Sequence, residues 1–123
     1  MAISGWIGVD LDGTLAHYGG WKGAYHIGEP IPKMVERVKK WLAEGSEVRV
    51  FTARVGMTEK GEDTAEFTAQ QTALIQDWCE KHVGQRLNVT ATKDLAMIEL
   101  YDDRCVQVIV NTGELVRAYG IER

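Results

Sequence analysis

The chain has few cysteines and prolines and no long apolar run. Two cysteines and two prolines among 123 residues are too few for a disulfide framework or a cysteine-rich zinc module. We therefore expect Cys79 and Cys105 to be small core residues. No apolar stretch approaches the ~20 residues of a membrane-spanning helix, and the first residues lack a signal-peptide pattern. These absences predict a cytoplasmic protein.

The chain also lacks an excess of basic residues. Fourteen lysines and arginines stand against eighteen acidic residues, a net charge of -4, which argues against broad, nonspecific attraction to nucleic acid. A hydrophobic fraction of 45% and a charged fraction of 26% are typical of soluble globular proteins. The length predicts a single domain over residues 1–123.

The most informative positive feature is residues 5–15. An apolar run with Ile7 and Val9 ends abruptly in Asp10 and Asp12, followed by a glycine. The run is typical of a strand buried on both faces. Buried carboxylates are costly unless they are paired or bound to a metal, and the carboxyl ends of parallel strands are where α/β sheets bind ligands. This favours a site over the alternative, a strand that simply enters an Asp-Gly turn.

Three more predicted strands end in polar residues with useful chemistry. Residues 47–51 lead to Thr52, residues 88–92 lead to Lys93, and residues 97–101 lead to Asp102 and Asp103. In a parallel sheet these ends meet at one edge. We expect the hydroxyl, the amine and the carboxylates to surround one site.

Apolar periodicity predicts two helices between the strands. One covers residues 31–44 and the other residues 64–82, with Asp63 and Glu66 at the spacing of a capping box. Alternation over residues 106–110, followed by Asn-Thr-Gly, predicts a last strand that enters a hairpin or forms an edge. The predicted fold class is α/β, with a doubly wound, mostly parallel, Rossmann-like sheet.

These motifs resemble those of the haloacid dehalogenase (HAD) superfamily of aspartate-nucleophile phosphatases. Asp10-Leu11-Asp12-Gly13-Thr14 is similar to the first motif of that family. Thr52 is similar to the second, Lys93 to the third, and Asp102-Asp103 to the fourth. The likeness extends over residues 5 to about 110. Neither intermotif segment has room for the cap domain of larger members, so the resemblance implies a capless phosphatase.

The resemblance implies an Mg²⁺-dependent phosphomonoester hydrolase. Asp10 would attack phosphorus to form an aspartyl-phosphate, and Asp12 would act as general acid and then general base. The other expected catalytic residues are Thr52, Lys93 and Asp102. Repulsion among the carboxylates calls for a cation, and all-oxygen ligands favour Mg²⁺. Its expected ligands are Asp10, the main-chain carbonyl of Asp12, and Asp103, which is favoured over Asp102.

The identity of the substrate is left open by the sequence. The expected substrate-binding residues are Gly13, Thr14, Ala53 and Arg54, the last either on phosphate or in a structural role. Tyr18, Trp21 and Tyr25, in the loop over residues 17–26, either stack on a base or pack the loop onto the sheet.

Two alternatives remain. The segment Asp-Asp-Arg-Cys-Val-Gln-Val is similar to phage-type polynucleotide kinase/phosphatases, which implies a polynucleotide 3′-phosphatase or a nucleotidase with the same chemistry. A receiver-like phosphoacceptor domain has similar parts. Its acid pair, however, precedes the acceptor aspartate, whereas here Asp10 comes first.

Overall fold

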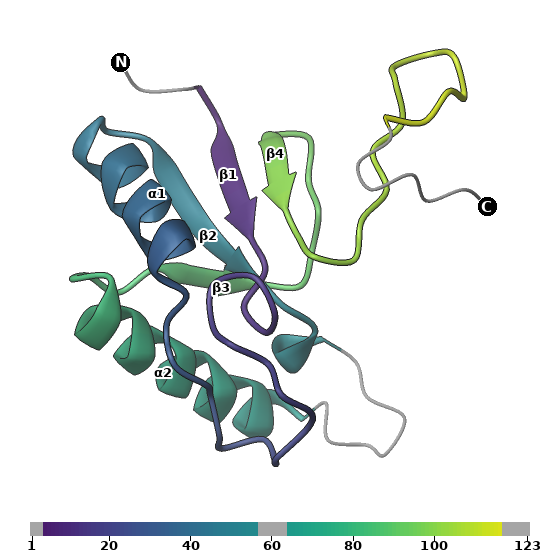
Figure 1. Cartoon of the computed structure of the whole chain (residues 1–123). Coiled ribbons are helices and arrows are strands. Elements are labelled where there is room, and N and C mark those ends of the chain that lie inside the picture. The colour runs from purple at the N-terminus through teal and green to yellow at the C-terminus, as the bar shows by residue number, and fades with distance from the viewer. Residues whose placement is uncertain (1–3, 57–63, 117–123) are drawn as a thin grey trace.

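The computed structural model describes residues 4–56 and 64–116. Four parallel strands form one sheet in the order β3-β2-β1-β4, with α-helices in the first two crossovers (Figure 1). This confirms the predicted α/β class and the Rossmann-like parallel sheet. The elements are β1 (Trp6–Val9), α1 (Pro32–Ala43), β2 (Glu47–Phe51), the 3-10 turn η1 (Ala53–Val55), α2 (Ala65–His82), β3 (Asn88–Thr90) and β4 (Met97–Tyr101).

Both α-helices pack on the same face of the sheet. Their buried side chains form one cluster with the side chains that β1 and β2 direct toward them, which include Ile7, Val9, Val48 and Val50. This arrangement follows from two successive crossovers that move the chain in the same direction, from β1 to β2 to β3. Within the described ranges, helices therefore cover one face only. β1 lies in the interior of the sheet, and all four of its residues are buried.

On the opposite face of the sheet, the large side chain of Trp6 lies over β1. Trp6 is 1% exposed. Its indole Nε1 donates a 2.8 Å hydrogen bond to Asp94, and the guanidinium of Arg49 lies 4.5 Å from the ring centroid. Gly8 permits this arrangement, because a Cβ there would meet the Trp6 ring and the Leu100 side chain at 3.2 Å. The Asp94 contact also holds the β3–β4 connection against the start of β1.

The start of α2 differs from the predicted capping box. The hydroxyl of Thr64 caps the helix by accepting a 3.1 Å hydrogen bond from the amide of Phe67, whereas Asp63 lies outside the described residues. The buried face of α2 consists of Gln71, Ile75, Trp78 and Cys79, which confirms the expected core position of Cys79. Neither α-helix of the described chain is long and apolar enough to cross a membrane.

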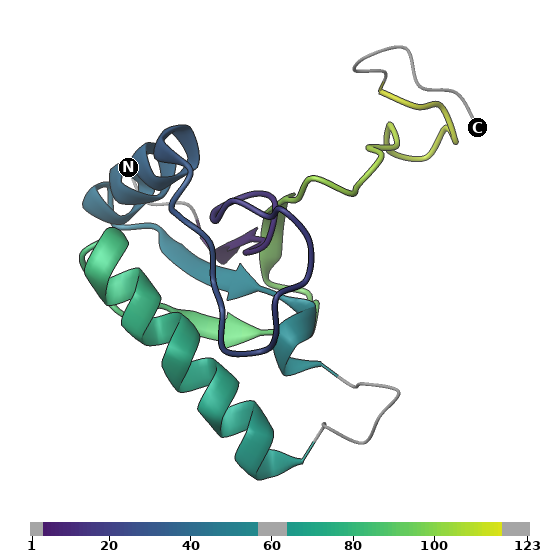
Figure 2. The ribbon, with the colours of Figure 1, turned by 60° about the horizontal axis from the view of Figure 1, so that its bottom comes forward.

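The prediction of a regular strand over residues 106–110 is wrong, but the predicted hairpin is present, because the amides of Ile109 and Val116 donate to the carbonyls of Glu114 and Gln107, each at 2.8 Å. After Asp103 the chain runs away from the sheet in both views (Figures 1 and 2). Val108 forms only an isolated antiparallel bridge with Leu115, around a turn in which Asn111 has φ 63°. Without a neighbouring strand to pair with, the alternating valines stay exposed. Cys105 is also exposed, contrary to the expectation of a core residue.

Candidate active site

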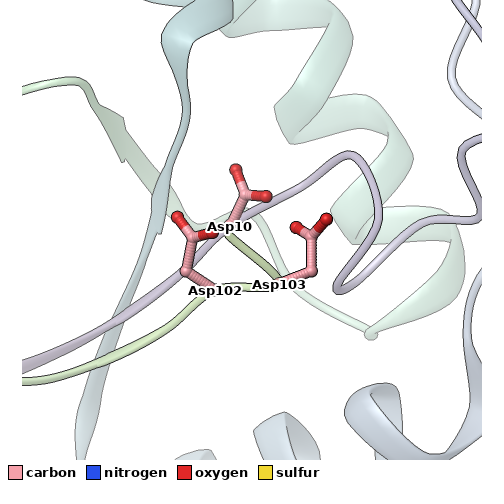
Figure 3. Close-up of side chains that lie close together, drawn as sticks. All are labelled: Asp10, Asp102 and Asp103. Atoms are coloured by element: carbon pink, nitrogen blue, oxygen red, sulfur yellow. The ribbon is translucent and has the colours of Figure 1, made fainter. Parts of the chain in front are cut away.

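Parallel pairing of β1 with β4 brings three aspartates together. Asp10 directly follows β1, and its amide donates a 2.9 Å hydrogen bond to the carbonyl of Tyr101, the last residue of β4. Asp102 and Asp103 follow at once. One carboxylate oxygen of each aspartate lies within 4.8 Å of the others, and Figure 3 shows the three side chains gathered beside the strand ends. The predicted convergence of these acids is confirmed.

The cluster is electrostatically unfavourable for Asp10 when no cation is present. The carboxyl group is half-buried, and the loss of solvation raises its pKa from 3.8 to about 7. A hydrogen bond with Asp103 and the charges of Asp102 and Asp103 act in the same direction. A positive charge between these oxygens would remove the repulsion and favour the ionised form of Asp10.

Residues 11–16 form a compact turn that places Asp103. The amide of Ala16 donates to the carbonyl of Leu11 at 2.8 Å, and Gly13 has φ +92°, a left-handed conformation suited to glycine. A Cβ at Gly13 would lie only 2.6 Å from Oδ2 of Asp103. The hydroxyl of buried Thr14 donates to Oδ1 of Asp103 at 3.1 Å and accepts from the Asp103 amide at 3.0 Å. The Thr14 hydroxyl therefore contacts both the side chain and the main chain of Asp103 and fixes the orientation of this residue.

Asp12 forms a bidentate ion pair with Arg54. Nε of Arg54 donates to Oδ2 at 2.7 Å and a terminal nitrogen donates to Oδ1 at 2.9 Å, with side-chain exposures of only 5% for Arg54 and 21% for Asp12. Such a planar, two-point contact fixes the orientation of a carboxylate. The Asp12 side chain therefore stands apart from the cluster of Asp10, Asp102 and Asp103.

Arg54 also fastens the loop between β1 and α1. Its terminal nitrogens donate to the carbonyls of Ala24 at 3.1 Å and His26 at 2.7 Å, and its guanidinium lies 5.0 Å from the ring centroid of Trp21. The loop is held further by the indole of Trp78, which donates to the Gly28 carbonyl at 3.0 Å. In Figure 2 this segment runs in front of the sheet, beside the carboxyl ends of the strands. The guanidinium of Arg54 thus binds both Asp12 and the loop between β1 and α1.

Thr52 and Ala53 border the same pocket as Asp10, whereas Lys93 does not. Thr52 is buried, and both it and Ala53 line a pocket that Asp10 also lines. The Thr52 hydroxyl accepts a 3.1 Å hydrogen bond from the Arg54 amide, which leaves its own O–H available to donate. Lys93 is exposed, does not line this pocket and forms no ion pair with the described carboxylates. Its predicted catalytic role stays a prediction.

The pocket beside Asp10 has a volume of about 400 Å³, within the range of small-molecule sites. Beyond the acids its wall includes four aromatic side chains, those of Tyr18, Trp21, Phe51 and Phe67. The Trp21 side chain is also 60% exposed. Tyr25 instead donates a 3.0 Å hydrogen bond to Gln70 on α2. Two of the three loop aromatics therefore border the pocket, while the third fastens the loop.

Two polar pocket residues, Gln71 and Arg104, are absent from the sequence-based prediction. Gln71 lines the pocket and is only 1% exposed, yet neither its Nε2 nor its Oε1 has a hydrogen-bond partner. Leaving such a group unsatisfied costs about 1–3 kcal/mol. The signal was present in the sequence, because Gln71 interrupts an apolar helix face four residues after Phe67 and four before Ile75. Arg104 immediately follows the acid pair and also lines the pocket.

Comparison with known proteins supports the fold. No protein-family model matches the chain, and no curated protein matches it in sequence. Among solved structures it is similar to a conserved protein coded by a locus of Bacteroides thetaiotaomicron, with a TM-score of 0.56 and 21% sequence identity. The alignment covers 84% of this chain and 78% of that one. At this identity the likeness shows a shared fold and leaves the activity to be argued from the site.

Proposed function

We propose that this protein is a metal-dependent phosphomonoester hydrolase that acts through an aspartyl-phosphate on Asp10. The observation that carries the proposal is the position of Asp10. It directly follows an interior strand, its carboxylate is grouped with those of Asp102 and Asp103, and it lines a pocket of about 400 Å³. Similarity of the first motif to the HAD phosphatases supports the same assignment.

The grouped aspartates suit a small divalent cation. Carboxylate oxygens are the ligands that Mg²⁺ prefers, and a cation offsets the repulsion that raises the pKa of Asp10 to about 7. Asp10 and Asp103 would hold the ion, together with the main-chain carbonyl of Asp12. We favour Asp103 over Asp102 as a direct ligand because Thr14 already orients it. When bound, the ion would supply charge compensation for the phosphoryl oxygens.

The protein's own side chains account for bond making and proton transfer. An oxygen of Asp10 forms a bond to phosphorus while the bond between phosphorus and the leaving oxygen breaks. Asp12 gives a proton to that leaving oxygen, and then takes one from the water that hydrolyses the aspartyl-phosphate. Thr52 donates its hydroxyl to a phosphoryl oxygen. Arg54 acts as a positioning residue through its contacts with Asp12.

The ion pair with Arg54 constrains both proton transfers by Asp12. Both oxygens of the carboxylate are bound by the guanidinium. To donate a proton to the leaving group, the same side chain must first release at least one oxygen from Arg54. We therefore propose that substrate binding loosens this pair, through the loop that Arg54 also holds.

The direct test is hydrolysis of p-nitrophenyl phosphate with and without Mg²⁺. We expect magnesium-dependent turnover in the wild type and a loss of at least about a thousandfold in Asp10→Asn, because an amide does not replace the nucleophile. Asp77→Asn is the matched control, since Asp77 is an exposed carboxylate outside the pocket. Turnover retained by Asp10→Asn, or equally lost in Asp77→Asn, would refute the assignment.

A further inference from the structure

The carboxamide of Gln71 lines the pocket but has no partner. It comes from the buried face of α2, where Ile75, Trp78 and Cys79 are apolar or thiol side chains that pack into the core. Gln71 is the one polar residue on that buried face. A leucine at this position would leave no hydrogen-bonding group unpaired, so the presence of an amide calls for an explanation.

Gln71 borders the same pocket as the proposed nucleophile. Asp10 lies at one part of the pocket wall, and Phe67, Tyr18 and Trp21 form other parts. A ligand whose phosphate reaches Asp10 can therefore extend its other end toward aromatic rings and one carboxamide. Aromatic side chains favour a flat ring, which they can contact through its faces.

A carboxamide presents one donor and one acceptor in a single plane. It is complementary to a ring that carries an acceptor beside a donor, and such an edge is found on each nucleobase. A sugar phosphate without a base would instead offer several hydroxyl groups. Apart from the acids, Arg54 and Arg104, the polar side chains of the pocket wall are Tyr18, Trp21, Thr52 and Gln71, and two of these four are aromatic rings.

We propose that this pocket binds a nucleobase, with Gln71 pairing to its hydrogen-bonding edge, so that the phosphomonoester substrate is a nucleotide. The proposal rests on the function proposed for Asp10 and names its substrate class. Gln71 is 1% exposed, so the base must displace a neighbouring side chain or draw the carboxamide toward the pocket. Binding would then satisfy both unpaired atoms at once.

The test compares two substrates that differ only in the base. Nucleoside 5′-monophosphates are compared with ribose 5-phosphate at saturating Mg²⁺, for the wild type and for Gln71→Leu. We expect the substitution to lower kcat/KM for nucleotides about tenfold, mainly through KM. It should change the ribose 5-phosphate value less than about twofold. Gln85→Leu is the matched control, because Gln85 is an exposed glutamine just after α2 and lies outside the pocket.

The stability of the variant separates recognition from packing. Removing an unsatisfied buried amide should leave the melting temperature unchanged or raise it. Equal losses on both substrates, or unchanged nucleotide kinetics, would overturn the role of Gln71. A wild-type enzyme that hydrolyses ribose 5-phosphate as well as it hydrolyses nucleotides would overturn the base site and leave the phosphatase assignment intact.

Binding provides a readout that does not depend on hydrolysis. Titration of nucleoside monophosphates, followed by tryptophan fluorescence, should show saturable binding that weakens in Gln71→Leu, and in the wild type it should shift the side-chain amide resonance of Gln71. Binding without turnover would support the base site and refute the proposed hydrolase. A second comparison uses 3′-phosphorylated oligonucleotides as substrates. If they are preferred over free nucleotides, the base belongs to a nucleic-acid end; otherwise it belongs to a mononucleotide.

Discussion

Arg54 holds both carboxylate oxygens of Asp12, at 2.7 and 2.9 Å, although the two residues are 42 positions apart. The pair joins the turn after β1 to the residues after β2. The same guanidinium binds main-chain carbonyls of the loop that borders the pocket. The orientation of the proposed acid/base is therefore coupled to the position of that loop.

Replacing Arg54 should destabilise the protein and impair proton transfer. Arg54→Ala leaves a largely buried Asp12 without its partner, which should lower the unfolding free energy by about 3 kcal/mol. Urea denaturation checks this expectation. Arg86→Ala is the matched control, because Arg86 forms an exposed pair with Asp77 and its loss should leave stability almost unchanged. Equal stability of Arg54→Ala and the wild type would contradict a supporting role for the pair.

Magnesium should stabilise the folded protein more strongly as the pH rises. The pKa of Asp10 is about 7 in the folded protein and 3.8 without the site. Folding therefore favours the proton on Asp10, and this contribution, complete below about pH 4, is lost as the pH rises toward 7. Mg²⁺ competes with that proton and gains affinity over the same interval.

Thermal melts with and without millimolar Mg²⁺, at about pH 5 and about pH 8, test this coupling. The magnesium-induced rise in melting temperature should be larger at the higher pH. Asp10→Asn should show a smaller rise and less dependence on pH. A melting temperature that does not respond to Mg²⁺ at either pH would contradict the metal assignment.

Thr14 should influence metal affinity through its two hydrogen bonds with Asp103. Thr14→Val removes the hydroxyl that orients Asp103 and should weaken Mg²⁺ binding at least about tenfold, as is usual for partners of metal ligands. Thr14→Ser keeps the hydroxyl and should restore most of the affinity. Calorimetric titration with Mg²⁺ measures the difference. Equal affinities for Thr14→Val and Thr14→Ser would show that the hydroxyl does not position Asp103.

Asp102 and Asp103 should differ in how much each contributes to Mg²⁺ binding. The side chain of Asp102 accepts a 2.7 Å hydrogen bond from the Arg104 amide, whereas Asp103 is oriented toward Asp10 by Thr14. We expect Asp103→Asn to lose more affinity for Mg²⁺ than Asp102→Asn in the same titration. The reverse order would make Asp102 the direct ligand.

The sequence predicts the centre of the fold better than its periphery. Apolar runs that end in aspartate predict the position of Asp10, Asp102 and Asp103, because parallel pairing alone brings the ends of β1 and β4 together. Lys93 follows the same pattern, but β3 is the edge strand two positions from β1. From there the chain turns back toward Trp6, where the neighbouring Asp94 is held.

Other features depend on contacts that no local pattern specifies. The predicted strand over residues 106–110 has suitable alternation, yet in the described part of the chain it joins no strand of the sheet and pairs only with residues 114–116. The ion pair between Arg54 and Asp12 is likewise not predictable from the sequence, because the contact arises only when the turns after β1 and β2 lie side by side. Gln71 is absent from the prediction for a different reason. The apolar helix face around it indicates core packing and does not show that a pocket borders this position.

The lifetime of the phosphorylated protein tests the proposed mechanism most directly. With a labelled, activated phosphate ester, the wild type should form an aspartyl-phosphate that turns over rapidly. Asp12→Asn should accumulate it, because the amide cannot activate water, and Asp10→Asn should form none. A wild-type adduct that lasts for minutes and is unaffected by Asp12→Asn would contradict a hydrolase and identify a phosphoacceptor domain instead.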